Sequence, residues 1–165
     1  MAAVLSRLSG ISFMLLGLLS GASAKPSCAV VGDSIALGAG QHIGACRINA
    51  KNGIPSQAVI ARVNSSADVN VVSAGSNDPA NPQLRANLER IRSRARRVIW
   101  ILPIDSRARA KVEAVATAHG DPVVPFAPGG DHVHPRSDVA LARSIAAIMD
   151  ARPARPPASP PNASF

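Results

Sequence analysis

The stretch VIWIL, residues 98–102, is the clearest strand in the sequence, because five large apolar residues follow one another without a polar break. A strand that is apolar on both faces is typical of a parallel sheet covered by helices on both sides. Shorter apolar runs lie before and after it along the chain. We expect further strands at residues 28–31, 46–50, 68–73 and 122–126.

Amphipathic stretches separate these strands and predict helices. In the clearest of them, residues 82–96, Leu84, Leu88 and Ile91 recur at helical spacing. Alternating strands and helices predict an α/β fold, here a three-layer α/β/α sandwich around a five-stranded parallel sheet. Ligands of such folds bind in loops beyond the carboxyl ends of the strands. The other helices are expected at residues 34–43, 55–64, 106–119 and 136–149.

The first 24 residues resemble a signal peptide. Arg7 supplies a positive charge, residues 11–19 are mostly apolar, and residues 22–24 (ASA) fit a cleavage site. An uncleaved membrane anchor is the alternative, although the apolar run is shorter than the roughly 20 residues of a spanning helix. We therefore expect the protein to be exported, either to a periplasm or out of the cell.

The rest of the chain divides into one domain and a tail. Residues 25–150 have the length and apolar content of a single globular domain. Residues 151–165 are rich in Pro, Ala and Arg and have little to bury, so we expect them to be disordered.

The chain is basic, with 18 Lys and Arg against 10 Asp and Glu and a formal net charge of +8. No nucleic-acid-binding motif accompanies this charge, and residues that stack on bases are scarce, with three Phe, one Trp and no Tyr. Basic residues at the end of the helix expected at 82–96 also suit the helix dipole. We expect a monomer without a nucleic-acid partner, loosely attracted to anionic surfaces of the cell envelope.

Cys28 and Cys46 are the only cysteines in the chain. In an oxidising compartment such a pair predicts one disulfide. The bond would close a short loop and stabilise the domain by roughly 3 kcal/mol at most. Two buried free thiols are the alternative.

Polar clusters follow the first, third and fifth expected strands. They are GDS at residues 32–34, GSND at residues 75–78 and DHVHP at residues 131–135. A glycine before Ser34 allows a sharp turn, and a helix that starts there directs free amides toward the site. Asn77 can donate its side-chain amide protons to an oxyanion, and Asp131 and His134 are spaced so that one turn can orient both.

Together these clusters supply what a serine nucleophile needs. A serine hydroxyl is a poor nucleophile until a base accepts its proton, and the base benefits from a carboxylate that fixes its tautomer. Donors must also point at the tetrahedral oxyanion. Each cluster alone is an ordinary turn, but their order on one parallel sheet predicts a hydrolase site.

The segment GDSIALG at residues 32–38 resembles the first block of the GDSL, or SGNH, hydrolase family. The GSND and DHVHP clusters resemble its Gly-x-Asn-Asp and Asp-x-x-His-Pro blocks, and Gly53 stands where the family keeps a glycine. The resemblance spans residues 28–149. It implies a flavodoxin-like sheet of the SGNH hydrolase type, and we expect no cofactor.

The resemblance also implies a role for each site residue. Ser34 would be the nucleophile, His134 the general base and Asp131 the carboxylate that orients it. The oxyanion hole would consist of the backbone amides of Ser34 and Gly53 and the side chain of Asn77.

Two features depart from this pattern or compete with it. In the second block, Lys51 takes the place of an Asn and Ser56 that of a later glycine. His132 is the alternative base, although it would point away from Ser34 if His134 points toward it. The His, Cys and acidic residues lack metal-ligand spacing, so we expect no metal.

These residues predict a small exported serine hydrolase that cleaves a small acyl ester through an acyl-Ser34 intermediate. The substrate is expected to be a small-molecule or glycan ester. An acyltransferase or deacetylase acting on exported polysaccharide or peptidoglycan would use the same residues, because only the acceptor differs. A non-catalytic cell-envelope binding protein on the same fold is a further alternative, and reactivity of Ser34 separates it from the enzymes.

Overall fold

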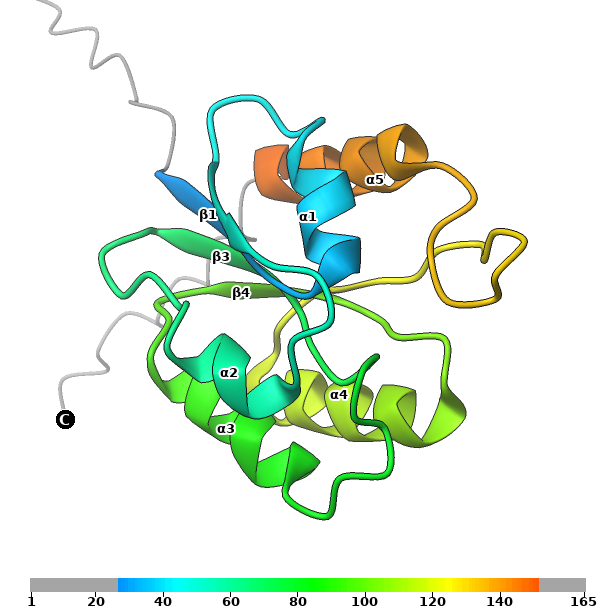
Figure 1. Cartoon of the computed structure of the whole chain (residues 1–165). Helices are drawn as coiled ribbons and strands as arrows, with labels where there is room; N and C mark the ends of the chain where they lie inside the picture. The colour runs from blue at the N-terminus through cyan, green and yellow to red at the C-terminus, as the bar shows by residue number, and fades with distance from the viewer. Residues whose placement is uncertain (1–26, 152–165) are drawn as a thin grey trace, which may run out of the picture.

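The computed structural model describes residues 27–151, and Figure 1 shows them as a sheet between two layers of helices. The expected leader and nearly all of the expected tail lie outside the described residues. None of the helices within residues 27–151 is long and apolar enough to cross a membrane.

The sheet has five parallel strands in the order β2-β1-β3-β4-β5, which confirms the predicted architecture and is the flavodoxin-like order. β5 is shorter than predicted, because Pro122 and Pro125 flank it and neither has an N–H group to donate. The strands are β1 (Cys28–Gly32), β2 (Arg47–Ala50), β3 (Val69–Ser73), β4 (Val98–Ile101) and β5 (Val123–Val124).

Helices cover both faces of this sheet, as Figure 1 shows. One face carries α1 (Ser34–Gly40) and α5 (Asp138–Asp150). The other face carries α2 (Ser56–Ile60), α3 (Leu84–Ser93) and α4 (Ser106–His119).

Both faces of strand β4 are buried under helices, which is why residues 98–102 are apolar throughout. Val98 and Trp100 belong to the core under α2, α3 and α4, whereas Ile99 and Ile101 belong to the core under α1 and α5. All four are buried. The single Trp lies in the middle of the first core, where its Nε1 donates a hydrogen bond to the carboxylate of Asp121 at 3.2 Å.

Two of the arginines around the end of α3 donate to carbonyls at the ends of other helices. Arg94 donates a hydrogen bond to the carbonyl of Ile60 at the end of α2 (3.0 Å), and Arg97 donates to the carbonyl of Ile148 in α5 (3.3 Å). Carbonyls at helix ends lack intrahelical partners, so the guanidinium groups satisfy them and complement the helix dipoles. These two positive charges therefore stabilise the fold.

Cys28 and Cys46 form a disulfide, so neither is a free thiol. The bond ties the first residue of β1 to the residue before β2. It therefore closes the α1–β2 connection at the end of the sheet away from the three polar clusters.

Candidate active site

The chain turns from β1 into α1 at Gly32, which has a φ of +138°. A Cβ atom there would collide with the carbonyl oxygen of Ser73 on the neighbouring strand, so only glycine allows this turn. Asp33 then caps α1, because its carboxylate accepts the backbone N–H of Ile35 at 3.1 Å. As a result Ser34 is the first residue of the helix and stands at the carboxyl edge of the sheet.

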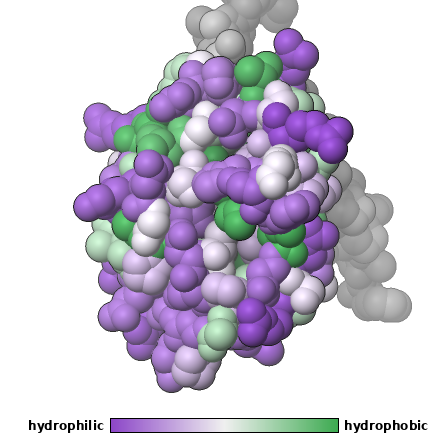
Figure 2. Space-filling view, turned by 45° about the vertical axis from the view of Figure 1, so that its right-hand side comes forward, coloured by the Kyte–Doolittle hydropathy of each residue, from purple (hydrophilic) through white to green (hydrophobic). Residues whose placement is uncertain are grey.

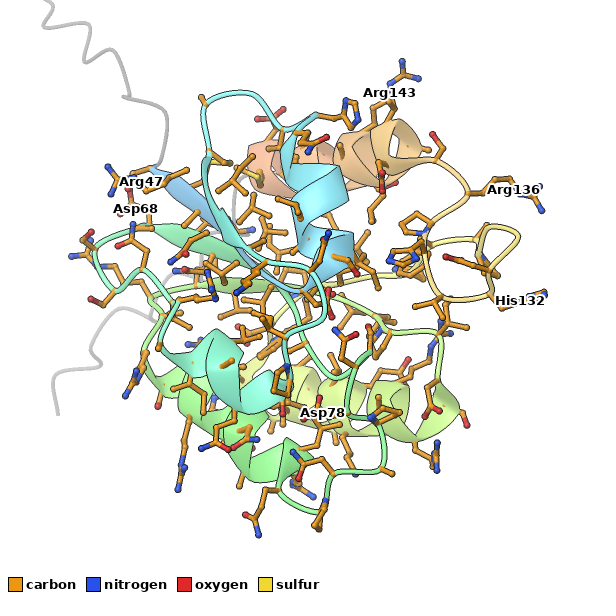
Figure 3. The ribbon with its side chains drawn as sticks, viewed as in Figure 1. Arg47, Asp68, Asp78, His132, Arg136 and Arg143 are labelled. Atoms are coloured by element: carbon orange, nitrogen blue, oxygen red, sulfur yellow. A yellow bond between two sulfur atoms is a disulfide. The ribbon has the colours of Figure 1, made fainter. Side chains whose placement is uncertain are left out.

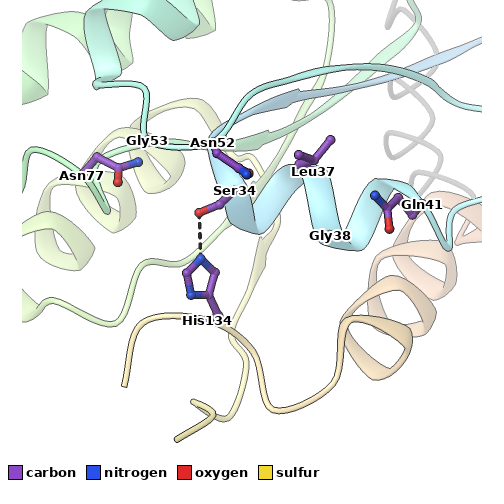
Figure 4. A pocket seen from close by; sticks show the side chains of 8 residues that line it. All are labelled: Ser34, Leu37, Gly38, Gln41, Asn52, Gly53, Asn77 and His134. Atoms are coloured by element: carbon purple, nitrogen blue, oxygen red, sulfur yellow. Dashed lines mark hydrogen bonds between the residues drawn. The ribbon is translucent and has the colours of Figure 1, made fainter. Parts of the chain in front are cut away.

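Ser34, His134 and Asp131 form a continuous hydrogen-bonded chain. The Oγ of Ser34 lies 2.8 Å from Nε2 of His134, the contact drawn in Figure 4. The Nδ1 of His134 lies 2.5 Å from Oδ2 of Asp131. When Nδ1–H donates to the carboxylate, Nε2 is left free to accept the serine proton. The structure thus brings together the three residues that the sequence predicted for nucleophile, base and orienting acid.

Asp131 is held in the orientation that this chain requires. Its second oxygen accepts the backbone N–H groups of Val133 (3.0 Å) and His134 (2.9 Å). The His134 ring, together with these backbone donors, holds the pKa of Asp131 well below its usual range. The carboxylate therefore stays ionised, as the partner of a proton-accepting imidazole should.

The loop that carries both residues is closed like a small hairpin. Pro128 and Pro135 form an isolated antiparallel bridge, and Gly129 N–H donates to the carbonyl of His134 at 2.7 Å. Arg136 N–H donates to the carbonyl of Ala127 at 2.9 Å. These bonds fix the base on a loop that lacks regular secondary structure.

His132 does not compete for the serine. It adopts a positive φ of +60° at the tip of the loop, where its side chain is exposed and points outward in Figure 3. It borders a separate hollow together with Val133 and Ser76. The structure therefore pairs His134, and not His132, with Ser34.

Gly53 and Asn77 border the same cavity as Ser34 and His134, a cleft of about 490 Å³ that is open to solvent (Figure 4). Gly53 has a φ of +69°, and no heavy atom outside residues 52–54 lies within 4 Å of where its Cβ would stand. The side-chain Nδ2 of Asn77 donates to the carbonyl of Ile54 at 3.1 Å, which leaves its second N–H free. The residues predicted for the oxyanion hole thus line one wall of the cleft.

A buried polar network that the sequence did not indicate joins the two loops that carry Gly53 and Asn77. Ser56 is fully buried, and its Oγ donates to Oδ2 of Asp78 at 2.6 Å while its N–H donates to Oδ1 at 3.1 Å. Asn87 of α3 donates to the Ser56 Oγ at 2.9 Å. Through these bonds Ser56 acts as a clamp that joins the two loops.

A buried carboxyl, that of Asp33, lies under the start of α1. It is fully buried, and this burial raises its pKa above the usual value of 3.8, although the hydroxyl of Ser73 and the amide of Ile35 partly oppose the effect. Asp33 does not contact the cleft, so its role here is structural.

Within residues 27–151, no group of three or more His, Cys, Asp and Glu side chains is placed to hold a metal ion.

No protein-family model matches the chain, and no curated protein matches it significantly. Among solved structures, the chain is similar to the C-terminal catalytic domain of peptidoglycan O-acetyltransferase A from Streptococcus pneumoniae, determined with a methylsulfonyl adduct. The TM-score is 0.55 at 18% sequence identity, over 74% of this chain and 91% of that one. At this identity the likeness concerns the backbone arrangement, and the chain has an SGNH-like fold.

Proposed function

We propose that the protein is an acyl-transfer enzyme that uses Ser34 as its nucleophile. The observation that carries the proposal is the hydrogen-bonded chain from Ser34 Oγ through the His134 ring to Asp131. This arrangement is the one by which a serine hydroxyl becomes reactive at neutral pH. Its position at the mouth of an open cleft gives an ester access to the hydroxyl.

In the first half-reaction, Nε2 of His134 accepts the Ser34 proton while Oγ bonds to the acyl carbon of the ester. The carbonyl electrons move onto oxygen, and the resulting oxyanion is stabilised by the amides of Ser34 and Gly53 and the free N–H of Asn77. The intermediate collapses when the alkoxide leaves with the proton from His134. The acyl group then remains on Ser34.

In the second half-reaction, an acceptor hydroxyl gives its proton to His134 and attacks the acyl-Ser34 ester. The bond between the acyl carbon and Ser34 Oγ then breaks, and His134 returns the proton to Oγ. Water as acceptor gives hydrolysis, and a sugar hydroxyl gives transfer. We favour transfer to a polysaccharide of the cell envelope over hydrolysis of a small ester, because the similar solved domain belongs to a peptidoglycan O-acetyltransferase. The fold and the Ser–His–Asp chemistry suit either acceptor.

The proposed site of action is outside the cytoplasm. The disulfide between Cys28 and Cys46 supports this, because such bonds persist mainly in oxidising compartments. The signal-peptide pattern of residues 1–24 points the same way.

The proposal is tested by turnover of p-nitrophenyl acetate and by labelling with a fluorophosphonate probe. Ser34→Ala should abolish both while the circular dichroism spectrum stays unchanged. Ser144→Ala is the matched control, because Ser144 lies on α5 and, within residues 27–151, its side chain bonds only to its own helix, at Ala140. Folded wild-type protein that neither turns over the ester nor takes up the probe would favour the non-catalytic binding protein.

Product analysis separates transfer from hydrolysis. With p-nitrophenyl acetate as donor and an oligosaccharide present, transfer predicts an acetylated sugar whose yield rises with acceptor concentration. A hydrolase would release only free acetate at every acceptor concentration.

A further inference from the structure

The cleft extends well beyond the reacting atoms. Four of the eight residues that line it are assigned to the acyl chemistry above, and the other four have no part in that chemistry. They are Leu37, Gly38, Gln41 and Asn52 (Figure 4). A volume of about 490 Å³ falls within the range of ligand sites, so there is room for more than an acetyl group.

One side of helix α1 forms the floor of this extension. Ser34, Leu37 and Gln41 are spaced three and four residues apart, so they lie along one face of the helix. At a rise of 1.5 Å per residue, the backbone of Gln41 lies about 10 Å along the axis from that of Ser34. In Figure 4, Gln41 lies at the far end of α1 from the Ser34–His134 contact, while Asn52 lies beside Gly53.

The extension offers neutral hydrogen-bonding groups. The side chains of Gln41 and Asn52 are exposed, and neither makes a hydrogen bond to another residue in the described part of the chain. Each carboxamide presents two donor hydrogens and an acceptor oxygen, the combination that matches a sugar hydroxyl or acetamido group.

The lining also disfavours other ligand classes. Apart from His134, none of the eight lining residues is ionisable, and the carboxylate of Asp138 lies against Gly38, so the cleft favours an uncharged ligand over an anion. Leu37 is the only large apolar side chain, too little to bury a long acyl chain. Figure 2 turns the side of the molecule with the strand ends toward the viewer, and hydrophilic residues cover most of that face.

We propose that the cleft along α1 is a subsite for an uncharged sugar residue of the acylated glycan, and that Gln41 and Asn52 determine this specificity. The inference rests on the proposed acyl chemistry at Ser34. The sugar lies along α1 with its hydroxyls on the two carboxamides, and the ester oxygen reaches Ser34 and His134. Gln41 and Asn52 hold the sugar and take no part in proton transfer.

The test is competition against p-nitrophenyl acetate by oligosaccharides of equal length and different charge, using the full chain. An N-acetylated chito-oligosaccharide should inhibit by binding to the free enzyme, which lowers the kcat/KM of p-nitrophenyl acetate, a constant that reaction of the sugar with acyl-Ser34 does not change. An oligogalacturonate of the same length should lower this kcat/KM much more weakly. Gln41→Ala and Asn52→Ala should each raise the Ki of the neutral oligosaccharide about tenfold, the effect of one lost hydrogen bond. Gln83→Ala is the control, because it removes a carboxamide from an exposed position outside the cleft. This substitution should leave the Ki unchanged.

The result that overturns the inference differs from the one that overturns the proposed function. Equal inhibition by the anionic oligomer, an absence of inhibition by the neutral one, or a Ki that neither substitution changes would each refute the sugar subsite while Ser34-dependent turnover persists. Ester turnover that survives Ser34→Ala would refute the proposed function, and the sugar subsite, which rests on that function, would be refuted with it.

Discussion

At the scale of single residues, Asn77 offers the sharpest test of the oxyanion hole. One of its amide hydrogens is held by the carbonyl of Ile54, so the other has a defined direction before substrate arrives. Asn77→Ala should lower kcat about 10²- to 10³-fold with little change in KM, because the lost bond strengthens only in the transition state. Steady-state kinetics on p-nitrophenyl acetate measure both constants.

Asn77→Asp controls for the shape of this side chain. It keeps the size of Asn77 but places a carboxylate where a donor is needed, so kcat should fall at least as far. If either variant retained wild-type kcat, the side chain of Asn77 would not be a donor to the oxyanion.

Asp131 should affect kcat by fixing which ring nitrogen of His134 carries the proton. Asp131→Asn removes the ionised acceptor of the Nδ1–H group, which favours the wrong tautomer, and kcat should fall about 10⁴-fold. Because the wild-type pKa of Asp131 is held well below its usual range, the wild-type rate should show no separate step near pH 4 that belongs to this carboxyl. A profile of kcat/KM from pH 4 to 9 tests both statements, and a loss of less than tenfold in the variant would contradict the assigned role.

Asp33 should affect stability and its dependence on pH. Since burial raises the pKa of Asp33, the folded protein keeps a proton that the unfolded chain releases, and stability falls as pH rises from the usual value of 3.8 through the raised one. Asp33→Asn keeps an oxygen for the Ile35 amide but has no charge to bury. The variant should therefore gain stability relative to wild type as pH rises, and the gain should vanish near pH 3. Urea unfolding at several pH values measures it, and a difference independent of pH would show that Asp33 is not the titrating group.

The sequence already indicated the residues that meet at Ser34, because a Ser, an Asn and an Asp-x-x-His cluster each follow a strand of the parallel sheet. It could not indicate Ser56, whose importance depends on two partners distant in the chain, Asp78 and Asn87. The available signal was Asn87 itself, a polar residue among the apolar positions Leu84, Leu88 and Ile91 of α3.

At the scale of elements, the contact between α2, α3 and the loop after β3 should couple stability to catalysis. Ser56→Ala removes the hydroxyl that donates to Asp78 and that accepts from the buried Asn87 side chain, while Asp78 keeps the backbone N–H of residue 56 and the side chain of Asn81. The free energy of unfolding should therefore fall by about 1–3 kcal/mol. Because the same clamp joins the loops of Gly53 and Asn77, kcat should fall as well. Ser93→Ala is the control, since Ser93 is exposed and, in the part of the chain that the structure describes, its side chain bonds only within its own helix, so neither quantity should change.

The kinetic and unfolding measurements on Ser56→Ala must be read together. Lower stability with an unchanged kcat in the folded protein would mean that the clamp supports the fold without positioning the oxyanion hole. That outcome would contradict the coupling proposed here.

Element types were predictable because hydrophobic period and length distinguish a buried strand such as 98–102 from an amphipathic helix such as 82–96. The residues at which the elements begin and end were less predictable. The helix predicted at 34–43 ends at Gly40, and the one predicted at 55–64 begins after Pro55 and ends at Ile60. Propensity changes gradually along those stretches, whereas the real ends depend on caps and on packing against other elements.

At the scale of the whole molecule, one end of the sheet carries the candidate active site and the other end carries the disulfide. The carboxyl ends of the strands carry Ser34, Asn77 and the His134 loop, while the opposite end carries Arg47, Asp68 and the disulfide, as Figure 3 shows for the two charged residues. β1 spans five residues, or about 17 Å at the usual rise of a strand, so the disulfide and the site are well separated.

This separation predicts that the disulfide affects stability without affecting catalysis. Its cysteines are 18 positions apart, and closing a loop of that length stabilises a folded domain by about 3 kcal/mol, through the entropy of the unfolded chain. Cys28→Ser with Cys46→Ser should therefore lower the midpoint of urea unfolding and make it insensitive to reductant, whereas wild type should shift toward the variant when reduced. Without denaturant, kcat on p-nitrophenyl acetate should be that of wild type. A large loss of kcat in the folded variant would mean that the two ends of the sheet are coupled, and an unchanged midpoint would mean that the bond constrains little in the unfolded chain.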